Sequence, residues 1–574
     1  MVTKAPLCRL NSRTVSLRVW PLLSASRCAF FFLAFIFLHT WPALAQEGSG
    51  LKAQNKRIKV PELWQTVEKS TSLSLEKRRR LAATLHDLVD KIPADQSMEK
   101  SNVYAALSVL HASDFLLMHS SLSFLVAAEK IWPDFVRTKY ANYVWKQFLK
   151  YMARKQIVNE HLLSRVAGVL AAGNIMASES SEFPYYMGWS FFREEKYSDA
   201  LGILEKVPIG SPHYRRSKFL EATSLVMLGR IADARESYQI VVSLSPSAAE
   251  DRYGIPRRSI QRLRDLSVVN VARLLYEQSQ FKESLAYYRA IDQDSFFFYE
   301  SLAEQGWSFF MAGYPTRALG AAYAATSPFY SDRFNPDVYF LFATLYFWLC
   351  QYDYAEQALS GFINHAQFEG DSLRVFISGV QKLAAAQKSE RLLAVIDAVD
   401  QGLNPKNIGL GPKTLAFLKG QEGLMDSYQG FLALRGRRLR VQNLRLEKTM
   451  QNRVLTAIEE YEDELKKQVS LQAEDALVGL RDDYDHALGQ SRLLWLEILT
   501  AQKDKILGNE RSVQGNQFVG TEKNFVDALT KGKETSWRQD KYEFWFDELG
   551  SYVFDTKSKC FSSSAQVPGG SAPK

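Results

Sequence analysis

The sequence predicts an all-α protein, made of an α-solenoid, a long helical or coiled-coil segment and a short aromatic hairpin near the C-terminal end. Three observations indicate this class. The pentapeptide GWSFF occurs twice, at 188–192 and at 306–310. Small and large apolar residues recur around both copies with a period of 34 residues, which is typical of stacked helix pairs. No proline lies between 413 and 567, where apolar residues step by three and four.

The N-terminal segment 1–45 has the three parts of a secretory signal peptide. Five basic residues and no acidic residue precede position 28, the apolar run 29–38 follows, and the sequence ALA at 43–45 offers small residues to a signal peptidase. The run is shorter than the about 20 residues that a transmembrane helix needs. We therefore expect cleavage after Ala45 and a periplasmic protein, with an uncleaved anchor as the alternative, and interpret 46–57 as a polar linker.

The net charge bears on nucleic-acid binding, and the cysteine positions bear on a possible disulfide. The formal net charge is +8 over 574 residues, and removal of the five basic residues of the signal lowers it to +3. A mature chain with so small a net charge gives no indication of nucleic-acid binding. Two of the four cysteines lie in the signal, and the other two, Cys350 and Cys560, either form one disulfide in an oxidising compartment or remain separate thiols.

Five units of the 34-residue period fit one register if Gly188 is position 8 of the first unit. Position 8 is small in every unit, and so is position 20. The residues at position 8 are Gly188, Ala222, Ala272, Gly306 and Ala343, and those at position 20 are Ala200, Ala234, Ser284, Ala318 and Ala355. An insert near 248–264 separates the second unit from the third.

This pattern resembles the tetratricopeptide repeat (TPR) family over about residues 181–365. The resemblance implies that two helices, A and B, cross at positions 8 and 20 of each unit, where a larger side chain would hold the backbones apart. Large residues at position 11, Phe191 and Phe309 among them, would fill the core beside the crossing. A single unit cannot bury its apolar face alone, so the units must stack.

In this family the concave surface is lined mainly by helix A positions 2, 5, 9, 12 and 13. Here these positions are mostly aromatic, and large exposed apolar patches on soluble proteins mark contact sites. The candidate groove residues are Tyr185, Trp189, Phe192, Arg193, Phe219, Arg273, Tyr276, Trp307, Phe310, Phe340, Phe347 and Trp348. The arginines would hold a carboxylate of the partner. Two alternatives stay open: an external protein fills the groove, or the chain's own C-terminal hairpin fills it.

Helical periodicity without the repeat signature continues on both sides of the repeats. Residues 58–180 are predicted to form a helical N-terminal region of decayed repeats or a cap, and 366–412 a helical cap and loop. The segment 413–510 is predicted to form a long helix or coiled coil. Gly479 and Gly489 leave open whether this helix is continuous or folds into a hairpin.

Seven aromatic residues crowd into 537–554, within a C-terminal aromatic module at 511–560. Two aromatic runs flank the sequence DELG at 547–550 and predict a short β-hairpin. It should dock elsewhere on the chain, because an isolated hairpin is only marginally stable. Over this short stretch the chain also resembles the tails of exported TPR proteins of Gram-negative envelope machines, including gliding-type machinery. The tail 561–574 is predicted to be disordered.

The sequence offers little catalytic chemistry. It contains no G-x-S-x-G, H-E-x-x-H or paired-cysteine metal motif, and the stretch NPKNIGLGPKT has Pro412 where a phosphate loop needs glycine. His111 and His119 lie eight residues apart without a third metal ligand nearby. We therefore expect no cofactor, no metal and no enzyme activity.

The expected function is that of an exported, non-enzymatic TPR scaffold or adaptor. It would bind protein partners in the bacterial cell envelope through the aromatic groove and the coiled-coil segment. The mature chain would have no transmembrane span, with peripheral membrane association as a further option. Alternatives are a binder of peptidoglycan or polysaccharide, whose sugars would contact the aromatic rings, and a hydrolase without a visible motif.

Overall fold

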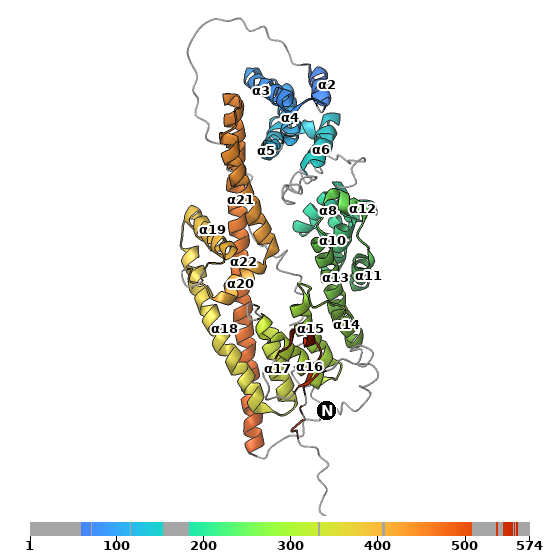
Figure 1. The fold of residues 1–574 in the computed structure, drawn as a ribbon, viewed down its shortest axis with the longest axis vertical. Coiled ribbons are helices and arrows are strands. Elements are labelled where there is room, and N and C mark those ends of the chain that lie inside the picture. Colours follow the sequence, from blue (N-terminus) through green and yellow to red (C-terminus); the bar gives the residue numbers. More distant parts are fainter. Residues whose placement is uncertain are drawn as a thin grey trace, which may run out of the picture.

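The computed structural model describes residues 59–152 apart from 71 and 115, 183–403 apart from 331, 332 and 334, 408–507, 535–537, and 544–560 apart from 555 and 557. The predicted signal peptide, linker and disordered tail lie outside these residues. Nearly all described elements are helices, which confirms the all-α class. Figure 1 shows helices α8 to α17 in one column and the long helices α18, α21 and α22 beside it.

The first helices form a small bundle around α4. They are α2 (Val60–Ser70), α3 (Leu75–Lys91), α4 (Ser97–Ala112), α5 (Met118–Ile131), the 3-10 helix η1 (Pro133–Arg137) and α6 (Lys139–Met152). Helix α4 is buried along most of its length because α2, α3, α5 and α6 pack against it. Trp64 of α2 is buried there, with its indole stacked on Tyr140 (ring centroids 5.0 Å apart) and its Nε1 donating to Asn102 Oδ1 (2.8 Å).

Five helical hairpins follow, and each packs against the next. They are α8 (Phe183–Arg193) with α9 (Tyr197–Leu204), α10 (Tyr214–Met227) with α11 (Ile231–Ser243), α13 (Arg257–Glu277) with α14 (Phe281–Tyr288), α15 (Phe298–Met311) with α16 (Pro315–Ala325), and α17 (Pro336–Trp348) with α18 (Tyr352–Gln381). The short helix α12 (Ala248–Tyr253) lies in the insert between the second and third hairpins.

All five hairpins turn in the same way. The N–H of Gly313 donates to Phe310 O (3.0 Å) and that of Tyr314 donates to Phe309 O (2.8 Å), which are the two bonds of a Schellman cap. The same pair of bonds recurs at the other four turns. Each turn residue has a positive φ and stands at position 15 of the 34-residue register: Glu195 (59°), Gly229 (75°), Ser279 (60°), Gly313 (91°) and Cys350 (55°).

The glycines of the two GWSFF copies allow the paired helices to approach closely. A Cβ added at Gly188 would overlap a leucine side chain of α9 and lie 3.4 Å from Ala200 O. One added at Gly306 would overlap a leucine side chain of α17 and lie 3.5 Å from Ala318 O. The prediction that these glycines lie at a helix crossing, opposite the small residue at position 20, is therefore confirmed.

The chain leaves the hairpins through the second half of α18. It continues into α19 (Ala385–Gln401), α20 (Pro412–Gly420), α21 (Glu422–Gln442) and α22 (Lys448–Ile506). Helix α22 has 59 residues. At 1.5 Å per residue such a helix is about 90 Å long. It runs through Gly479 and Gly489 without a break, so the chain does not turn at either glycine. The predicted segment 413–510 is nevertheless not one helix, because the chain turns at 443–447 and α21 packs against α22.

Helix α22 is covered by its own chain and is not a free coiled-coil strand. One side is buried along its whole length, at residues that include Met450, Val454, Ile458, Leu465, Val469, Leu477, Tyr484, Leu488 and Ile498. Helices α18, α19 and α21 pack against it, and α3 and α5 pack against it as well. Neither α22 nor any other helix in the described ranges is both long and apolar enough to cross a membrane.

The two short strands near the C-terminal end are β1 (Thr535–Trp537) and β2 (Tyr552–Phe554), and they pair in parallel. The predicted hairpin, which requires antiparallel strands, is therefore wrong. The chain before β2 is turned by the 3-10 helix η5 (Phe546–Glu548), and the N–H of Trp545 donates to Tyr552 Oη (2.9 Å), which closes this turn. The described part of the aromatic run before DELG, residues 544–546, is therefore not the strand that pairs with β2.

Candidate interaction surface

Residues 544–560, which we name the strap, lie across α16. Phe544 stacks on Tyr323 of α16 with the ring centroids 4.4 Å apart. Tyr552 and Phe554 meet the same ring edge-on, at 5.8 Å and 5.1 Å. The strap is thus held by one tyrosine that contacts three of its aromatic side chains.

The far end of the strap is fixed at the turn of the fifth hairpin. Gln351 Nε2 donates to Thr556 Oγ1 (2.7 Å). Cys350, the turn residue itself, forms a disulfide with Cys560 across 210 positions of sequence. Of the two states that the sequence leaves open for these cysteines, the structure has the bridged one.

The strap does not lie in the predicted groove. Gly320 of α16 is so close to Tyr552 O that an added Cβ would overlap it, and Gly550 lies against side chains at the start of α15. Its ring contacts and hydrogen bonds include none with Trp307 or Phe310, and it meets the predicted groove residues at the backbone of Trp348, where Cys560 Sγ lies 3.4 Å from Trp348 O. The chain's own C-terminal segment therefore docks on the hairpins, but on a different face.

The predicted groove residues differ in exposure. Tyr185 and Phe192 are buried, Arg193 is exposed, and the other nine are half-buried. The prediction that all of them line an open groove is therefore wrong for Tyr185 and Phe192.

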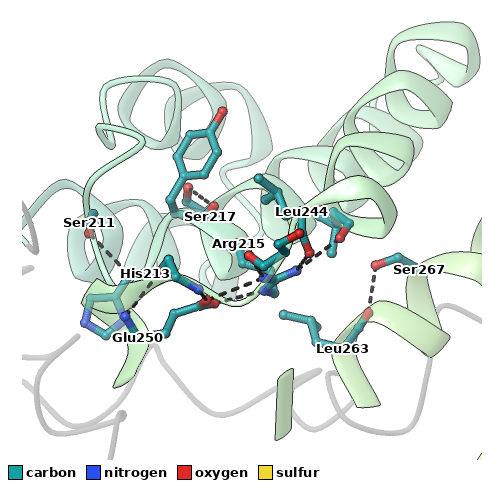
Figure 2. Close-up of polar contacts among 12 residues, drawn as sticks. Ser211, His213, Arg215, Ser217, Leu244, Glu250, Leu263 and Ser267 are labelled. Atoms are coloured by element: carbon teal, nitrogen blue, oxygen red, sulfur yellow. Dashed lines mark hydrogen bonds and ion pairs between the residues drawn. The ribbon is translucent and has the colours of Figure 1, made fainter. Parts of the chain in front are cut away.

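Tyr185 belongs to a buried network that fastens the insert. Its ring stacks on His213 with the centroids 4.4 Å apart, and burial lowers the pKa of His213 well below its ordinary value. Figure 2 shows Arg215 between Glu250 and Leu244, where its guanidinium donates to the Glu250 carboxylate and to Leu244 O (2.9 Å each). Glu250 lies in α12 and both charged groups are buried, so this ion pair anchors the insert to the second hairpin.

The two GWSFF copies bury different phenylalanines. In α15, Phe309 is buried against Tyr314 (centroids 6.4 Å apart), as its position 11 predicts. In α8, Phe192 is buried against Tyr197 (5.5 Å), whereas Phe191 is only half-buried. Phe191 therefore packs at the edge of the core, and Phe192 takes the buried place expected for Phe191. The tyrosine at the start of the second helix stands one position later in the first copy, and it selects the phenylalanine five residues before it.

Arg273 is not open to a partner's carboxylate, because it binds a carboxylate of its own chain. Its Nη2 lies 2.6 Å from Glu304 Oε1 and its Nε lies 2.8 Å from Oε2, while Tyr288 Oη donates to the same carboxylate (2.9 Å). Burial acts to lower the pKa of Arg273, but the Glu304 carboxylate outweighs burial and raises that pKa. The residue therefore joins the third hairpin to the fourth, and its predicted role in gripping a partner is wrong.

Most of the half-buried aromatic residues pack separately against the nearest helix. Arg193 lies over the Trp189 ring, 5.6 Å from its centroid. The ring pairs are Phe219 with Tyr238 (5.4 Å), Tyr276 with Phe281 (5.2 Å), Phe340 with Phe362 (6.0 Å) and Phe347 with Tyr352 (5.8 Å). These contacts fix single rings and do not join them into one strip.

Trp307, Phe310 and Trp348 are the predicted residues that the structure brings together. Trp307 meets Phe310 edge-on at 6.3 Å, and Phe310 meets Trp348 edge-on at 5.8 Å. The rings come from α15 and α17, the first helices of adjacent hairpins, and all three are half-buried. We name these three residues the aromatic cluster. Large rings with few rotatable bonds lose little entropy on binding and dominate many interfaces.

A second aromatic surface forms where the strap meets the 3-10 helix η3 (Pro328–Tyr330). Phe329, Trp545 and Phe546 are 52%, 58% and 43% exposed, and the rings of Phe329 and Phe546 meet edge-on at 5.5 Å. We name these three residues the strap patch. No sequence pattern links Phe329 to the strap, so only the structure could reveal this patch.

The described residues contain no cluster of His, Cys, Asp or Glu that could hold a metal ion. His111 contacts His86 instead, with their Nε2 atoms 3.1 Å apart, and its Nδ1 lies 2.6 Å from Ser120 Oγ. Burial lowers the pKa of His86 to about 4 and that of His111 well below its ordinary value, so both rings are neutral at pH 7. The side chain of His119 lies outside the described part.

A scan against protein-family models finds no match, and no curated protein matches the sequence. The function must therefore be inferred from the residues and their geometry.

Proposed function

We propose that the chain is an exported, non-enzymatic scaffold of the TPR type, which binds a protein partner in the cell envelope. The observation that carries the proposal is the aromatic cluster, in which Phe310 meets both Trp307 and Trp348 and all three rings stay partly exposed. Aromatic side chains that remain partly exposed are the residues that partners most often bury at the centre of a protein interface.

The TPR assignment is supported by the repeated turn. Five hairpins place a residue of positive φ at one register position, and Gly188 and Gly306 meet position 20 at the helix crossing. Export is supported by the signal-like segment 1–45 and by the Cys350–Cys560 bridge, because disulfides persist mainly in oxidising compartments.

The partner that fits the aromatic cluster is an apolar helix or extended segment of another protein. The strap reaches the cluster at the Trp348 backbone, where Cys560 Sγ lies 3.4 Å from Trp348 O, and none of its ring pairs involves Trp307 or Phe310. The cluster is held by edge-on packing within the chain, so the rings are ordered before a partner arrives. A surface ordered in advance loses less entropy on binding.

The test is site-specific photo-crosslinking in intact envelopes. A photo-reactive residue is placed at Trp307, at Trp348 or, as a control, at Glu283, which is exposed on the second helix of the third hairpin. We expect one discrete protein adduct at both tryptophan positions and none at Glu283. Adducts at all three positions, or at none, would contradict the proposal.

Binding of a cell-wall polymer is a second candidate, favoured by the strap patch. Trp545 is 58% exposed, and sugar rings stack readily on an open indole. Co-sedimentation with purified sacculi checks this candidate. Retention that Trp545→Ala abolishes would favour the polymer, and retention that the substitution leaves unchanged would remove the candidate.

A further inference from the structure

The loop between α21 and α22 lies at the start of α22, the end of that helix at which α3 and α5 pack (Figure 1). Between positions 435 and 453 seven residues are Arg or Lys, and Glu447 is the one acidic residue. The net charge of the whole chain is only +8 over 574 residues, so nearly as much positive charge is concentrated in this short stretch.

Part of this charge is used inside the protein. Arg438 pairs with Glu462 (3.0 Å), and Arg453 pairs with Asp90 of α3. Arg437 is buried in the packing of α21. These three arginines therefore serve the fold.

Four cations remain on the surface, and we name them the basic tip. Within the described part of the chain no ion pair joins any of them to a carboxylate. The Glu447 carboxylate instead accepts the N–H groups of Thr449 and Met450 (2.9 Å each) and caps α22. The residues of the basic tip, all exposed, are Arg435, Arg440, Arg445 and Lys448.

The basic tip is carried by a fixed loop. Gln451 Nε2 lies within hydrogen-bonding distance of Val441 O (3.1 Å), Gln442 O (3.0 Å) and Leu444 O (3.2 Å), so one amide ties the end of α21 to the start of α22. Val441 and Met450 are buried beneath the loop. The four charges are therefore presented by an ordered helix end and not by a loose tail.

An apolar side chain stands among the cations. Leu439 is 54% exposed and lies four residues after Arg435, on the same face of α21. Basic residues around an exposed leucine are typical of a surface that meets the headgroup region of a membrane. No aromatic residue lies between 435 and 453, so the tip lacks the rings on which single-stranded nucleic acids stack.

We propose that the basic tip binds a membrane surface of anionic phospholipids, with guanidinium groups on phosphate oxygens and Leu439 between the headgroups. Arginine suits this role because its planar fork of N–H donors matches a phosphate group. The surface is separate from the aromatic cluster, so the chain could hold a protein partner while it lies against a membrane.

The test is co-sedimentation of the mature chain with lipid vesicles. One set of vesicles is pure phosphatidylcholine and the other also contains phosphatidylglycerol. The tip variant carries Arg435→Gln, Arg440→Gln and Arg445→Gln. A matched control carries Lys206→Gln, Lys467→Gln and Arg492→Gln, which remove the same charge from exposed positions elsewhere. Both variants are the mature chain without the predicted signal segment 1–45, because its apolar run would insert into either kind of vesicle.

We expect binding to the phosphatidylglycerol vesicles alone, weakened about 100-fold in the tip variant and little changed in the control. The estimate follows from about a fivefold loss for each basic residue removed near an anionic surface. Leu439→Gln should weaken vesicle binding without changing binding to polyglutamate. Equal losses in both variants would overturn the proposal. So would binding of polyglutamate or single-stranded DNA through the tip in the absence of vesicle binding.

Discussion

Position 320 sets how closely the strap approaches α16. Gly320 has no side chain, and the carbonyl of Tyr552 occupies the space where a Cβ would stand. Gly361 also lies inside a helix, but it faces open space. The same substitution at these two positions should therefore have opposite effects.

We predict that Gly320→Ala lowers the free energy of unfolding by about 1–3 kcal/mol, because the added methyl forces the strap away from α16. Gly361→Ala should raise it by up to about 1 kcal/mol, because alanine favours a helix interior. Chemical denaturation of both variants checks the prediction. Equal effects of the two substitutions would mean that the strap does not pack as described.

The two phenylalanines of the first GWSFF copy give a second prediction. Phe192 is buried and Phe191 is half-buried, in contrast to the order expected from the repeat register. Phe192→Ala should cost about 3–5 kcal/mol, as truncation of a buried aromatic ring does. Phe191→Ala should cost clearly less. Thermal unfolding of the two variants measures the difference. A larger loss of stability for Phe191→Ala would support the repeat register, in which Phe191 is the core residue.

For single residues, the sequence predicts which positions must be small better than it predicts which aromatic ring is buried. Gly188 and Gly306 are small because neighbouring helices approach them closely, and Ala234, at the expected position of the second unit, is fully buried. Which of two adjacent rings turns inward depends on a neighbour from the next helix, such as Tyr197 or Tyr314. The register of one helix does not contain that information.

Among the elements, α22 carries the clearest prediction. Gly479 lies inside this helix with no atom near the place of a Cβ. If the helix is continuous, Gly479→Ala should stabilise the protein by up to about 1 kcal/mol. If the chain turned at this glycine, the same change would destabilise it. Urea denaturation separates the two outcomes, and Gly361→Ala on α18 is the matched control.

The pair His86 and His111, which joins α3 to α4, should make stability depend on pH. Burial holds the pKa of His86 at about 4 in the folded protein, below its ordinary value of 6.5, and also lowers the pKa of His111. The unfolded chain therefore binds more protons in this window, so the free energy of unfolding should fall as pH is lowered from about 6.5 toward 4.

Denaturation at several pH values measures that fall. The double substitution His86→Gln with His111→Gln should flatten the dependence, whereas His486→Gln, at an exposed position on α22, should leave it unchanged. An unchanged slope in the double variant would show that the buried pair does not titrate as its environment requires.

Helices are predicted well from sequence because their signal is local, and strand pairing is not. Periodicity alone indicates α22 and the hairpins, and the insert shows as a break in the period. The partner of β2 is Thr535–Trp537, which the sequence DELG cannot reveal because the pairing is parallel and not a hairpin. The apolar stripe of α22 is also visible in the sequence, but the sequence does not show that α18, α19 and α21 pack against it.

Across the whole molecule, the hairpins, α22 and the strap are joined by long-range contacts. The Cys350–Cys560 bridge closes the strap onto the fifth hairpin, and Arg453 ties α22 to α3. The candidate site also depends on contacts between segments that are far apart in sequence. The sequence selects Trp307, Phe310 and Trp348 among twelve residues, but their mutual contact depends on how α15 and α17 stack.

The measurement that tests the central claim most directly uses Trp307→Ala with Trp348→Ala. A photo-reactive residue at Phe310 reports capture of the partner, and thermal unfolding reports the fold. We predict that the double change removes the adduct and lowers the melting temperature less than Phe309→Ala does, because both indoles are only partly buried whereas Phe309 is a buried ring. An undiminished adduct, or unfolding as severe as that of Phe309→Ala, would contradict the claim that the aromatic cluster is a binding surface.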